Sequence, residues 1–193
     1  MNERSLVEIL IWVGCLKRLK RAGWVQHGIE DGESVSEHSF HTALIAMIIS
    51  DNMDLRVDKV KLCRMALIHD LPEVVVGDVT PRDVIPRAER ELRELKAIQD
   101  LFRGDHCGGE YARLLIEYHQ QETREAKVLR AIDKLEMAIQ AYIYETEKGR
   151  TGLNEFYADA EQAADGTEIK ELFIELKKLR GAETNGTGEG PRF

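Results

Sequence analysis

Four side chains able to bind a metal stand in helical contexts along the chain: His38, the consecutive pair His69 and Asp70, and Asp133. The pair ends an apolar run, where burial without partners would be costly. Asp133 interrupts the apolar positions of a long helical segment. Two imidazoles and two carboxylates from three helices suit a divalent cation of borderline or hard character. We therefore predict a metal site inside a helical bundle.

Each of these residues also has a simpler interpretation. A single histidine such as His38 is commonly a buried or capping residue, and Asp70 could cap the next turn. Asp133 could pair with Lys134 or Arg130 on the surface. His41, three residues after His38, is the main competitor for a ligand role. The joint pattern, rather than any one residue, favours the metal.

The elements that must position these residues are all predicted to be helices. Apolar residues recur at helical spacing, and the chain has only four prolines. Ser34 to Glu37 form a capping-box pattern, Asp58 has the position of a helix cap, and Gly23 is expected to stop the first helix. The expected helices cover residues 6–16, 35–48, 59–68, 87–102, 110–119, 122–148, 154–164 and 168–179.

Length and composition predict one all-α domain. The chain has 193 residues, 43% of them apolar, so it can bury a sizeable core. We expect a single helical bundle over 1–180 with extra C-terminal helices, its chemistry between about 21 and 150, and a flexible tail over 181–193. The apolar end of the long helix, around Met137 to Tyr144, could contact a partner chain or the C-terminal helices.

Charge and cysteine content limit the possible partners. The 35 acidic and 27 basic residues give a net charge of -8, which disfavours nucleic acid and anionic membranes as partners. The longest apolar stretch, 42–49, is too short to span a bilayer. Three widely spaced cysteines and an N-terminus without a signal-peptide pattern predict a cytoplasmic protein.

Longer strings around the candidate ligands resemble a known family. The chain is similar to the HD-domain metal-dependent phosphohydrolases, and among these to the 5′-deoxynucleotidase branch. The resemblance covers residues 4–150 and rests on Gly23-Trp24, residues 33–39, residues 66–73 and Gly77-Asp78.

The resemblance implies a set of site residues. The implied ligands of one divalent ion, which could be Mn, Co, Fe, Zn or Mg, are His38, His69, Asp70 and Asp133. Glu73 and Asp78 match residues around the phosphate and the attacking water, and Trp24 matches a tryptophan near the sugar. Bacterial members have an arginine directly before that tryptophan, where this chain has Gly23. Either Arg21 reaches the phosphate instead, or that contact is absent.

The implied function is hydrolysis of (deoxy)ribonucleoside 5′-monophosphates. We expect in-line attack by a metal-bound water, with Glu73 and Asp78 moving protons in an order that the sequence does not assign. The alternatives are a phosphodiesterase or triphosphohydrolase acting on another nucleotide, and a catalytically silent nucleotide-binding or scaffold protein. The family resemblance also implies a homodimer.

Overall fold

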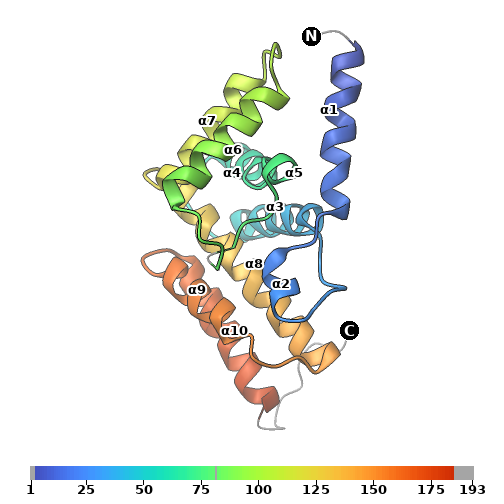
Figure 1. Cartoon of the computed structure of the whole chain (residues 1–193). Helices are drawn as coiled ribbons and strands as arrows, with labels where there is room; N and C mark the ends of the chain where they lie inside the picture. Colours follow the sequence, from blue (N-terminus) through green and yellow to red (C-terminus); the bar gives the residue numbers. More distant parts are fainter. Residues whose placement is uncertain (1–2, 81, 185–193) are drawn as a thin grey trace. The chain divides into compact units, whose positions relative to one another are not determined.

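The computed structural model describes residues 3–80 and 82–184. Within these ranges the chain is helical, and its only extended pairing is an isolated bridge between Lys20 and Ser34 (Figure 1). The predicted all-α class is confirmed. The chain divides into two compact units, the first ending at Ala126 and the second beginning at Lys127. The prediction of one domain over 1–180 remains a prediction.

The first unit holds the N-terminal helices and the greater part of the candidate site. Helices α3 and α4 pack together, α7 packs on α4, and α6 lies beside α7 (Figure 1). The elements of this unit are α1 (Glu3–Cys15), the 3₁₀ helix η1 (Leu16–Arg18), α2 (Ala22–Gln26), α3 (Val35–Asn52), α4 (Lys59–Ile68), α5 (Glu73–Val76), α6 (Arg87–Leu101) and α7 (Gly108–Gln120).

The starts of α3 and α4 follow the predicted caps. Ser34 accepts a hydrogen bond from the Glu37 backbone N–H, and the Glu37 side chain accepts one from the Ser34 backbone N–H, which completes the capping box. Asp58 caps α4 by accepting from the backbone N–H of Lys61 at 3.0 Å. These bonds satisfy N–H groups that a helix start would otherwise leave open. Because His38 lies in the first turn of α3, the cap also fixes its backbone.

Two backbone hydrogen bonds join the segment before α2 to the start of α3. Val35 donates to the carbonyl of Leu19 at 2.8 Å, and Arg21 donates to the carbonyl of Glu33 at 3.1 Å. The expectation that Gly23 stops the first helix is wrong. Helix α1 already ends at Cys15, and Gly23 lies inside the short helix α2. A glycine stops a helix only where the backbone turns there, and the turn here comes earlier, at Leu19.

A break in the helix separates α4 from α5. Helix α4 ends at Ile68, His69 is its C-cap, and Pro72 is the N-cap of α5. Helix α5 has four residues, and its C-cap is Gly77, whose φ of 82° is one that residues other than glycine rarely adopt. His69 itself keeps helical dihedral angles and donates its backbone N–H to the carbonyl of Met65, so the helical course ends only after it.

The second unit consists of most of α8 (Arg124–Lys148), α9 (Asn154–Ala164) and α10 (Ile169–Thr184), with α9 packed against α10. Arg180 joins the three helices: it contacts both carboxylate oxygens of Glu145 at 2.7 and 2.8 Å, donates to Asn154, and lies 3.8 Å from the Tyr157 ring centroid. The expected tail over 181–193 is wrong for 181–184, which continue α10. The rest of that prediction lies outside the described residues.

Burial differs from the sequence expectations in two helices. In α1 the apolar spacing does not mark a buried face, since Ile9 is buried while Leu6, Leu10 and Val13 are exposed. At the end of α8 the apolar residues around Met137 are buried, including Ala138, Ala141, Tyr142 and Tyr144. This favours packing within the chain at that position. Among the described residues no helix is long and apolar enough to cross a membrane.

Candidate metal centre

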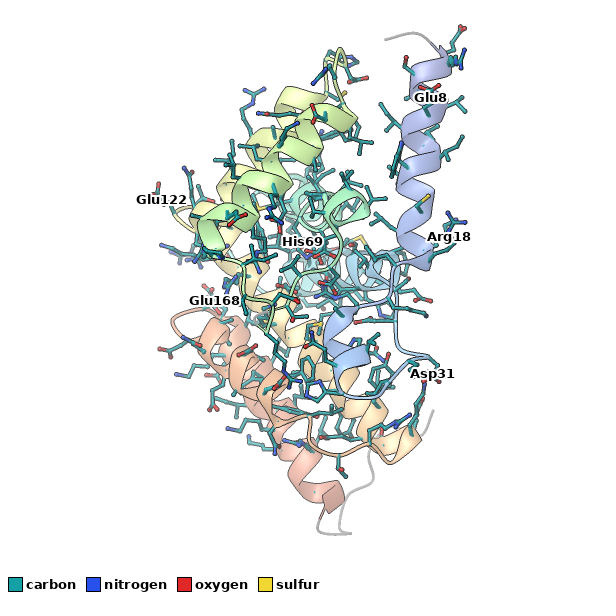
Figure 2. The ribbon with its side chains drawn as sticks, viewed as in Figure 1. Glu8, Arg18, Asp31, His69, Glu122 and Glu168 are labelled. Atoms are coloured by element: carbon teal, nitrogen blue, oxygen red, sulfur yellow. The ribbon has the colours of Figure 1, made fainter. Side chains whose placement is uncertain are left out.

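Three of the four predicted ligands lie close together, because His38 and His69 both approach the same carboxylate oxygen of Asp70. The Oδ2 atom of Asp70 lies 3.5 Å from His38 Nε2 and 3.3 Å from His69 Nε2. The two imidazole rings meet edge to face, with centroids 5.5 Å apart. One ligand atom from each residue lies within 4.8 Å of the other two, a spacing that a single ion could bridge. His38 and His69 are buried, and Figure 2 shows His69 among the helices of the first unit.

The orientation of His69 fits a cation at this point. Its Nδ1 lies 2.7 Å from the carbonyl oxygen of Ala66, and a carbonyl only accepts, so Nδ1 carries the hydrogen. In the neutral ring the lone pair of Nε2 then faces the Asp70 carboxylate. Two electron-rich atoms at 3.3 Å need a proton or a cation between them. A backbone carbonyl that fixes the tautomer is the usual support of a metal-binding histidine, so the donor set fits a divalent cation.

Arg21 lies among three carboxylates. Its Nη1 donates to Asp70 Oδ2 at 3.0 Å and to Asp78 Oδ1 at 3.4 Å, and it lies 3.6 Å from Glu73 Oε2. Asp78 also accepts from the backbone N–H of Ala22 at 2.7 Å, which fastens the loop after α5 to the start of α2. The structure therefore brings both predicted catalytic acids and the predicted phosphate-binding arginine to the predicted ligands.

Charge and burial shift the pKa values of Asp70 and Glu73 in opposite directions. Burial raises the pKa of Asp70, but the attraction of His69 and Arg21 outweighs it and holds that pKa well below the ordinary range. For Glu73, burial raises the pKa strongly, and repulsion by Asp70 adds to the rise. Asp70 is therefore suited to stay ionised as a ligand, and Glu73 is suited to hold a proton.

Trp24 lies in the interior rather than on a cavity wall. It is completely buried, and its indole N–H donates to Glu33 Oε1 at 2.9 Å. The same Glu33 oxygen lies 3.9 Å from His38 Nδ1, on the opposite side of the ring from Asp70. Trp24 is thus an interior anchor, and a sugar could contact it only after this part of the first unit had moved.

Asp133, the fourth predicted ligand, lies on α8 in the second unit. It is buried, and its Oδ2 lies 3.2 Å from Lys134 Nζ. Its role as a ligand remains a prediction. His41, the competing histidine, is exposed and does not belong to the His38, His69 and Asp70 cluster.

Two residues near the cluster, Glu33 and Tyr118, were not among the predicted site residues. Glu33 contacts both Trp24 and His38, and it belongs to the string that carried the family resemblance. Tyr118 of α7 packs edge to face on His69, with ring centroids 5.2 Å apart. The approach of Tyr118 depends on how α7 packs against α4, and nothing in its local sequence indicates it.

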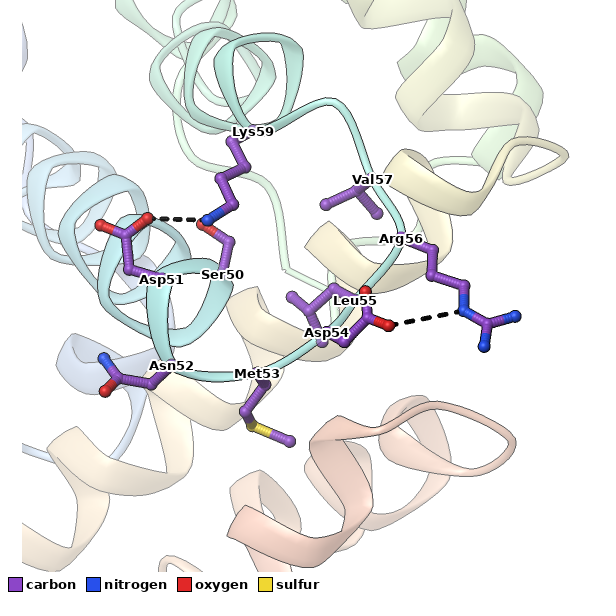
Figure 3. Close-up of a pocket in the computed structure, with 9 residues that line it drawn as sticks. All are labelled: Ser50, Asp51, Asn52, Met53, Asp54, Leu55, Arg56, Val57 and Lys59. Atoms are coloured by element: carbon purple, nitrogen blue, oxygen red, sulfur yellow. Dashed lines mark hydrogen bonds and ion pairs between the residues drawn. The ribbon is translucent and has the colours of Figure 1, made fainter.

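A second group of possible ligands and an open pocket lie elsewhere in the first unit. Asp105, His106 and Cys107 are close mainly because they are consecutive, and Asp105 already accepts from the Cys107 backbone N–H. A polar pocket of about 340 Å³ lies where α3 ends and α4 begins, lined by residues 50–57 and Lys59 (Figure 3). Along α3 it is roughly 18 Å from His38, so it is separate from the metal cluster.

Comparison with known proteins decides the family. A family model described as HD domain matches residues 13–172. The chain belongs to the HD domain family. This HD domain protein is 36% identical over 191 residues to a human protein named 5′-deoxynucleotidase HDDC2, an alignment that covers 97% of this chain and 92% of the relative. The predicted resemblance is thereby confirmed.

Solved structures show the same fold. A conserved hypothetical protein from Pyrococcus furiosus superposes with a TM-score of 0.75 at 31% identity, covering 90% of this HD domain chain and 99% of the other. A predicted metal-dependent phosphohydrolase from Magnetospirillum magnetotacticum superposes with a TM-score of 0.69 at 25% identity, covering 94% and 93%. Both matches extend over nearly the whole of each relative.

Proposed function

We propose that this HD domain protein is a metal-dependent phosphohydrolase that removes phosphate from (deoxy)ribonucleoside 5′-monophosphates. The convergence of His38, His69 and Asp70 on one point is the observation that carries the proposal. The name of the human relative supports the substrate class. The three free cysteines support a cytoplasmic location. The homodimer that the resemblance implies is also proposed.

The proposed metal ligands are His38, His69 and Asp70, with Asp133 added on the family resemblance alone. When bound, a divalent cation would polarise a phosphoryl oxygen and lower the pKa of water. The ligand set of nitrogen and carboxylate oxygen accepts Mn, Co, Fe, Zn or Mg. Asp70, whose pKa lies well below its ordinary value, would supply negative charge that balances the cation.

Arg21 has two tasks in the proposed mechanism. Its contacts to Asp70 and Asp78 offset carboxylate charge that would otherwise repel a phosphate. Its guanidinium also lies 3.0 Å from the proposed ligand Asp70, and a guanidinium pairs well with phosphate oxygens. A phosphate that enters the cluster would compete with the carboxylates for the same N–H donors. Arg21 is therefore proposed to hold the phosphate from the side of α2.

Glu73 and Asp78 are proposed to have different roles, proton transfer for Glu73 and positioning of Arg21 for Asp78. A buried Glu73 with a raised pKa is suited to give a proton to the leaving 5′-oxygen and to receive one from water. Asp78 is tied to the Ala22 backbone and to Arg21, which suits it to positioning the arginine. Trp24 is proposed to shape the sugar side of the site indirectly, through Glu33.

A phosphate-release panel tests the proposal. The purified chain is stripped with a chelator and assayed with deoxynucleoside and ribonucleoside 5′-monophosphates, a nucleoside triphosphate and a cyclic nucleotide, with and without added Mn²⁺. We expect release from the monophosphates that stops on chelation and returns with the metal. Turnover confined to the triphosphate or the cyclic nucleotide would overturn the substrate class. Metal binding with no turnover on any substrate would overturn the enzymatic proposal.

A further inference from the structure

Trp24 and Glu33 meet inside the first unit, beside His38 but outside the set of proposed ligands. The Trp24 indole N–H donates to Glu33 Oε1 at 2.9 Å, and both side chains are buried. The same Glu33 oxygen lies 3.9 Å from Nδ1 of His38, whose ring is completely buried. A carboxylate in the interior is costly unless polar groups lie around it. The three side chains therefore form one buried polar chain that ends at a proposed ligand.

The two histidines of the cluster have different groups beside the ring nitrogen that faces away from Asp70. For His69 this group belongs to the backbone, because Nδ1 lies 2.7 Å from the carbonyl oxygen of Ala66. For His38 a side-chain carboxylate, that of Glu33, lies on the Nδ1 side. A metal-binding histidine usually donates its other ring N–H to a carboxylate or a carbonyl, which fixes the ring and makes the ligating nitrogen more basic. Glu33 has the position and the chemistry of such a partner.

Electrostatics favour one tautomer of the His38 ring. The separation of 3.9 Å is too long for a hydrogen bond, so Glu33 acts here through its charge, which favours hydrogen on Nδ1. Asp70 Oδ2, 3.5 Å from Nε2, favours the opposite tautomer, but the Arg21 guanidinium at 3.0 Å offsets its charge. The Trp24 N–H is neutral and does not cancel the charge of Glu33. The hydrogen therefore belongs on Nδ1, and the lone pair of Nε2 faces Asp70.

Glu33 is held in place through both its backbone and its side chain. Its carbonyl accepts from the backbone N–H of Arg21 at 3.1 Å, and it directly precedes Ser34, the N-cap of α3. Its carboxylate is held by Trp24, which lies close to the backbone before α3. A Cβ added at Gly32 would come within 3.0 Å of the Trp24 Cβ, so glycine lets the indole approach at this point. The carboxylate thus has a defined position relative to the first turn of α3.

We propose that Glu33 is the positioning residue of His38. It keeps hydrogen on Nδ1 and so presents Nε2 to the divalent cation, while Trp24 holds the Glu33 carboxylate in place. This inference rests on the metal centre proposed above. It gives Trp24 a role that needs no contact with substrate, in agreement with its complete burial.

Calorimetric titration of the chelated full chain with Mn²⁺ tests the effect of Glu33 on the ion. Glu33→Gln keeps the size of the side chain and removes its charge. We expect the affinity for Mn²⁺ to fall by roughly 10- to 100-fold, the usual result of losing a residue that supports a ligand. Glu30→Gln, at an exposed residue of the same loop, is the matched control and should bind as the wild type does. Circular dichroism confirms that both variants stay helical.

Nitrogen NMR of the histidine rings separates positioning from a general loss of structure. The spectra are recorded on the metal-free chain at about pH 8, where an ordinary histidine is neutral. We expect His38 to carry hydrogen mainly on Nδ1 in the wild type and to shift towards the Nε2–H tautomer in Glu33→Gln. Trp24→Phe, which removes the indole N–H and keeps a ring, should shift both tautomer and affinity in the same direction by less. His69 is the internal control and should keep its tautomer throughout, because a backbone carbonyl supports it.

The outcomes separate this inference from the metal centre on which it rests. An unchanged Mn²⁺ affinity in Glu33→Gln, an unchanged His38 tautomer, or an equal loss of affinity in Glu30→Gln would each overturn it. A shift of both histidine tautomers would show a general structural change and would also overturn it. A wild-type chain that binds no Mn²⁺, while the His38 tautomer still shifts in Glu33→Gln, would overturn the metal centre and support the orientation of His38 by Glu33.

Discussion

A single carboxylate oxygen organises the candidate site. Oδ2 of Asp70 is the common neighbour of His38, His69 and Arg21. The grouping of His38, His69 and Asp70 could be predicted from their residue types and helical positions, whereas the place of Asp133 in the ligand set remains a prediction. The contacts of Glu33 and Tyr118 could not be predicted, because they depend on segments that meet only in the folded chain.

Asp70→Asn tests the organising role of this oxygen. The variant keeps the shape of the side chain but loses the charge that balances a cation. We expect the affinity for Mn²⁺ to fall by more than the roughly 10- to 100-fold that follows loss of a residue supporting a ligand, and activity to fall with it. Titration calorimetry measures the affinity. Asp51→Asn, at the far end of α3, is the matched control and should bind as the wild type does.

Glu73→Gln should separate binding from turnover. Asp70, His38 and His69 remain in place, so metal content should be near that of the wild type. Removing a group that moves a proton should lower kcat by about 10²- to 10⁴-fold. Metal analysis alongside a phosphate-release assay measures both. A variant with a near-native rate would exclude Glu73 from the mechanism.

The raised pKa of Glu73 also predicts how stability depends on pH in the metal-free chain. The folded pKa lies above the ordinary value of 4.5, so the folded state favours the protonated acid. Its contribution to the free energy of unfolding is complete below the unfolded pKa and is lost as the pH rises through the folded one. Glu73→Gln should therefore stabilise the chelated protein at about pH 8 relative to about pH 4. Urea unfolding at both pH values checks this, and an equal effect at both would contradict it.

At the scale of the element, helix starts were the most predictable feature. The caps at Ser34 and Asp58 depend on residues within one turn, and both are present. The division of the first segment into α1, η1 and α2 was not predictable. It depends on the pairing of Leu19 and Arg21 with residues before and at the start of α3, which lie more than ten positions away. A sequence pattern within one helical turn predicts a cap, whereas the turn at Leu19 depends on hydrogen bonds to residues distant in sequence, which no local pattern indicates.

Ser34→Ala should weaken α3 by about 0.5–2 kcal/mol, because the Glu37 N–H loses its acceptor. Hydrogen bonds from the Ser34 backbone and hydroxyl hold the pKa of Glu37 below its ordinary value. Glu37 therefore contributes stability above its unfolded pKa, and that contribution is lost as the pH falls through the folded pKa. Thermal unfolding of the wild type and of Ser34→Ala measures the difference. The difference should narrow in acid, where the bond from the Ser34 hydroxyl to the Glu37 carboxylate is lost, while the loss of the acceptor for the Glu37 N–H remains. A difference that grows in acid would contradict the interpretation.

Gly77→Ala should destabilise the first unit by about 1–2 kcal/mol, because a left-handed backbone strains any residue with a Cβ. The space around Gly77 is open, so strain rather than a clash is the cause. Gly109→Ala is the matched control: it lies in α7 with open space, and alanine there should be neutral or stabilising. Chemical denaturation of both variants measures the contrast. Equal effects would show that the backbone at Gly77 imposes no special demand.

At the scale of the whole molecule, binding of the cation links chemistry to stability. A ligand present at 100 times its dissociation constant and bound only by the folded state adds about 2.7 kcal/mol. For a chain of this length that corresponds to a rise in Tm of roughly 5–10 °C. Differential scanning fluorimetry of the chelated chain, with and without Mn²⁺, measures it. Asp70→Asn should show little of the rise, and a full rise in that variant would place the ion elsewhere.

The supports of the cluster have a consequence for how the protein exchanges its metal. The Ala66 carbonyl accepts a hydrogen bond from the His69 ring and so orients it. The capping box at Ser34 fixes the first turn of α3, which carries His38. Both supports are made by the polypeptide itself and do not need the ion. Emptying and refilling this centre should therefore be a rapid and repeatable exchange that leaves the helices in place, rather than a cycle of unfolding and refolding.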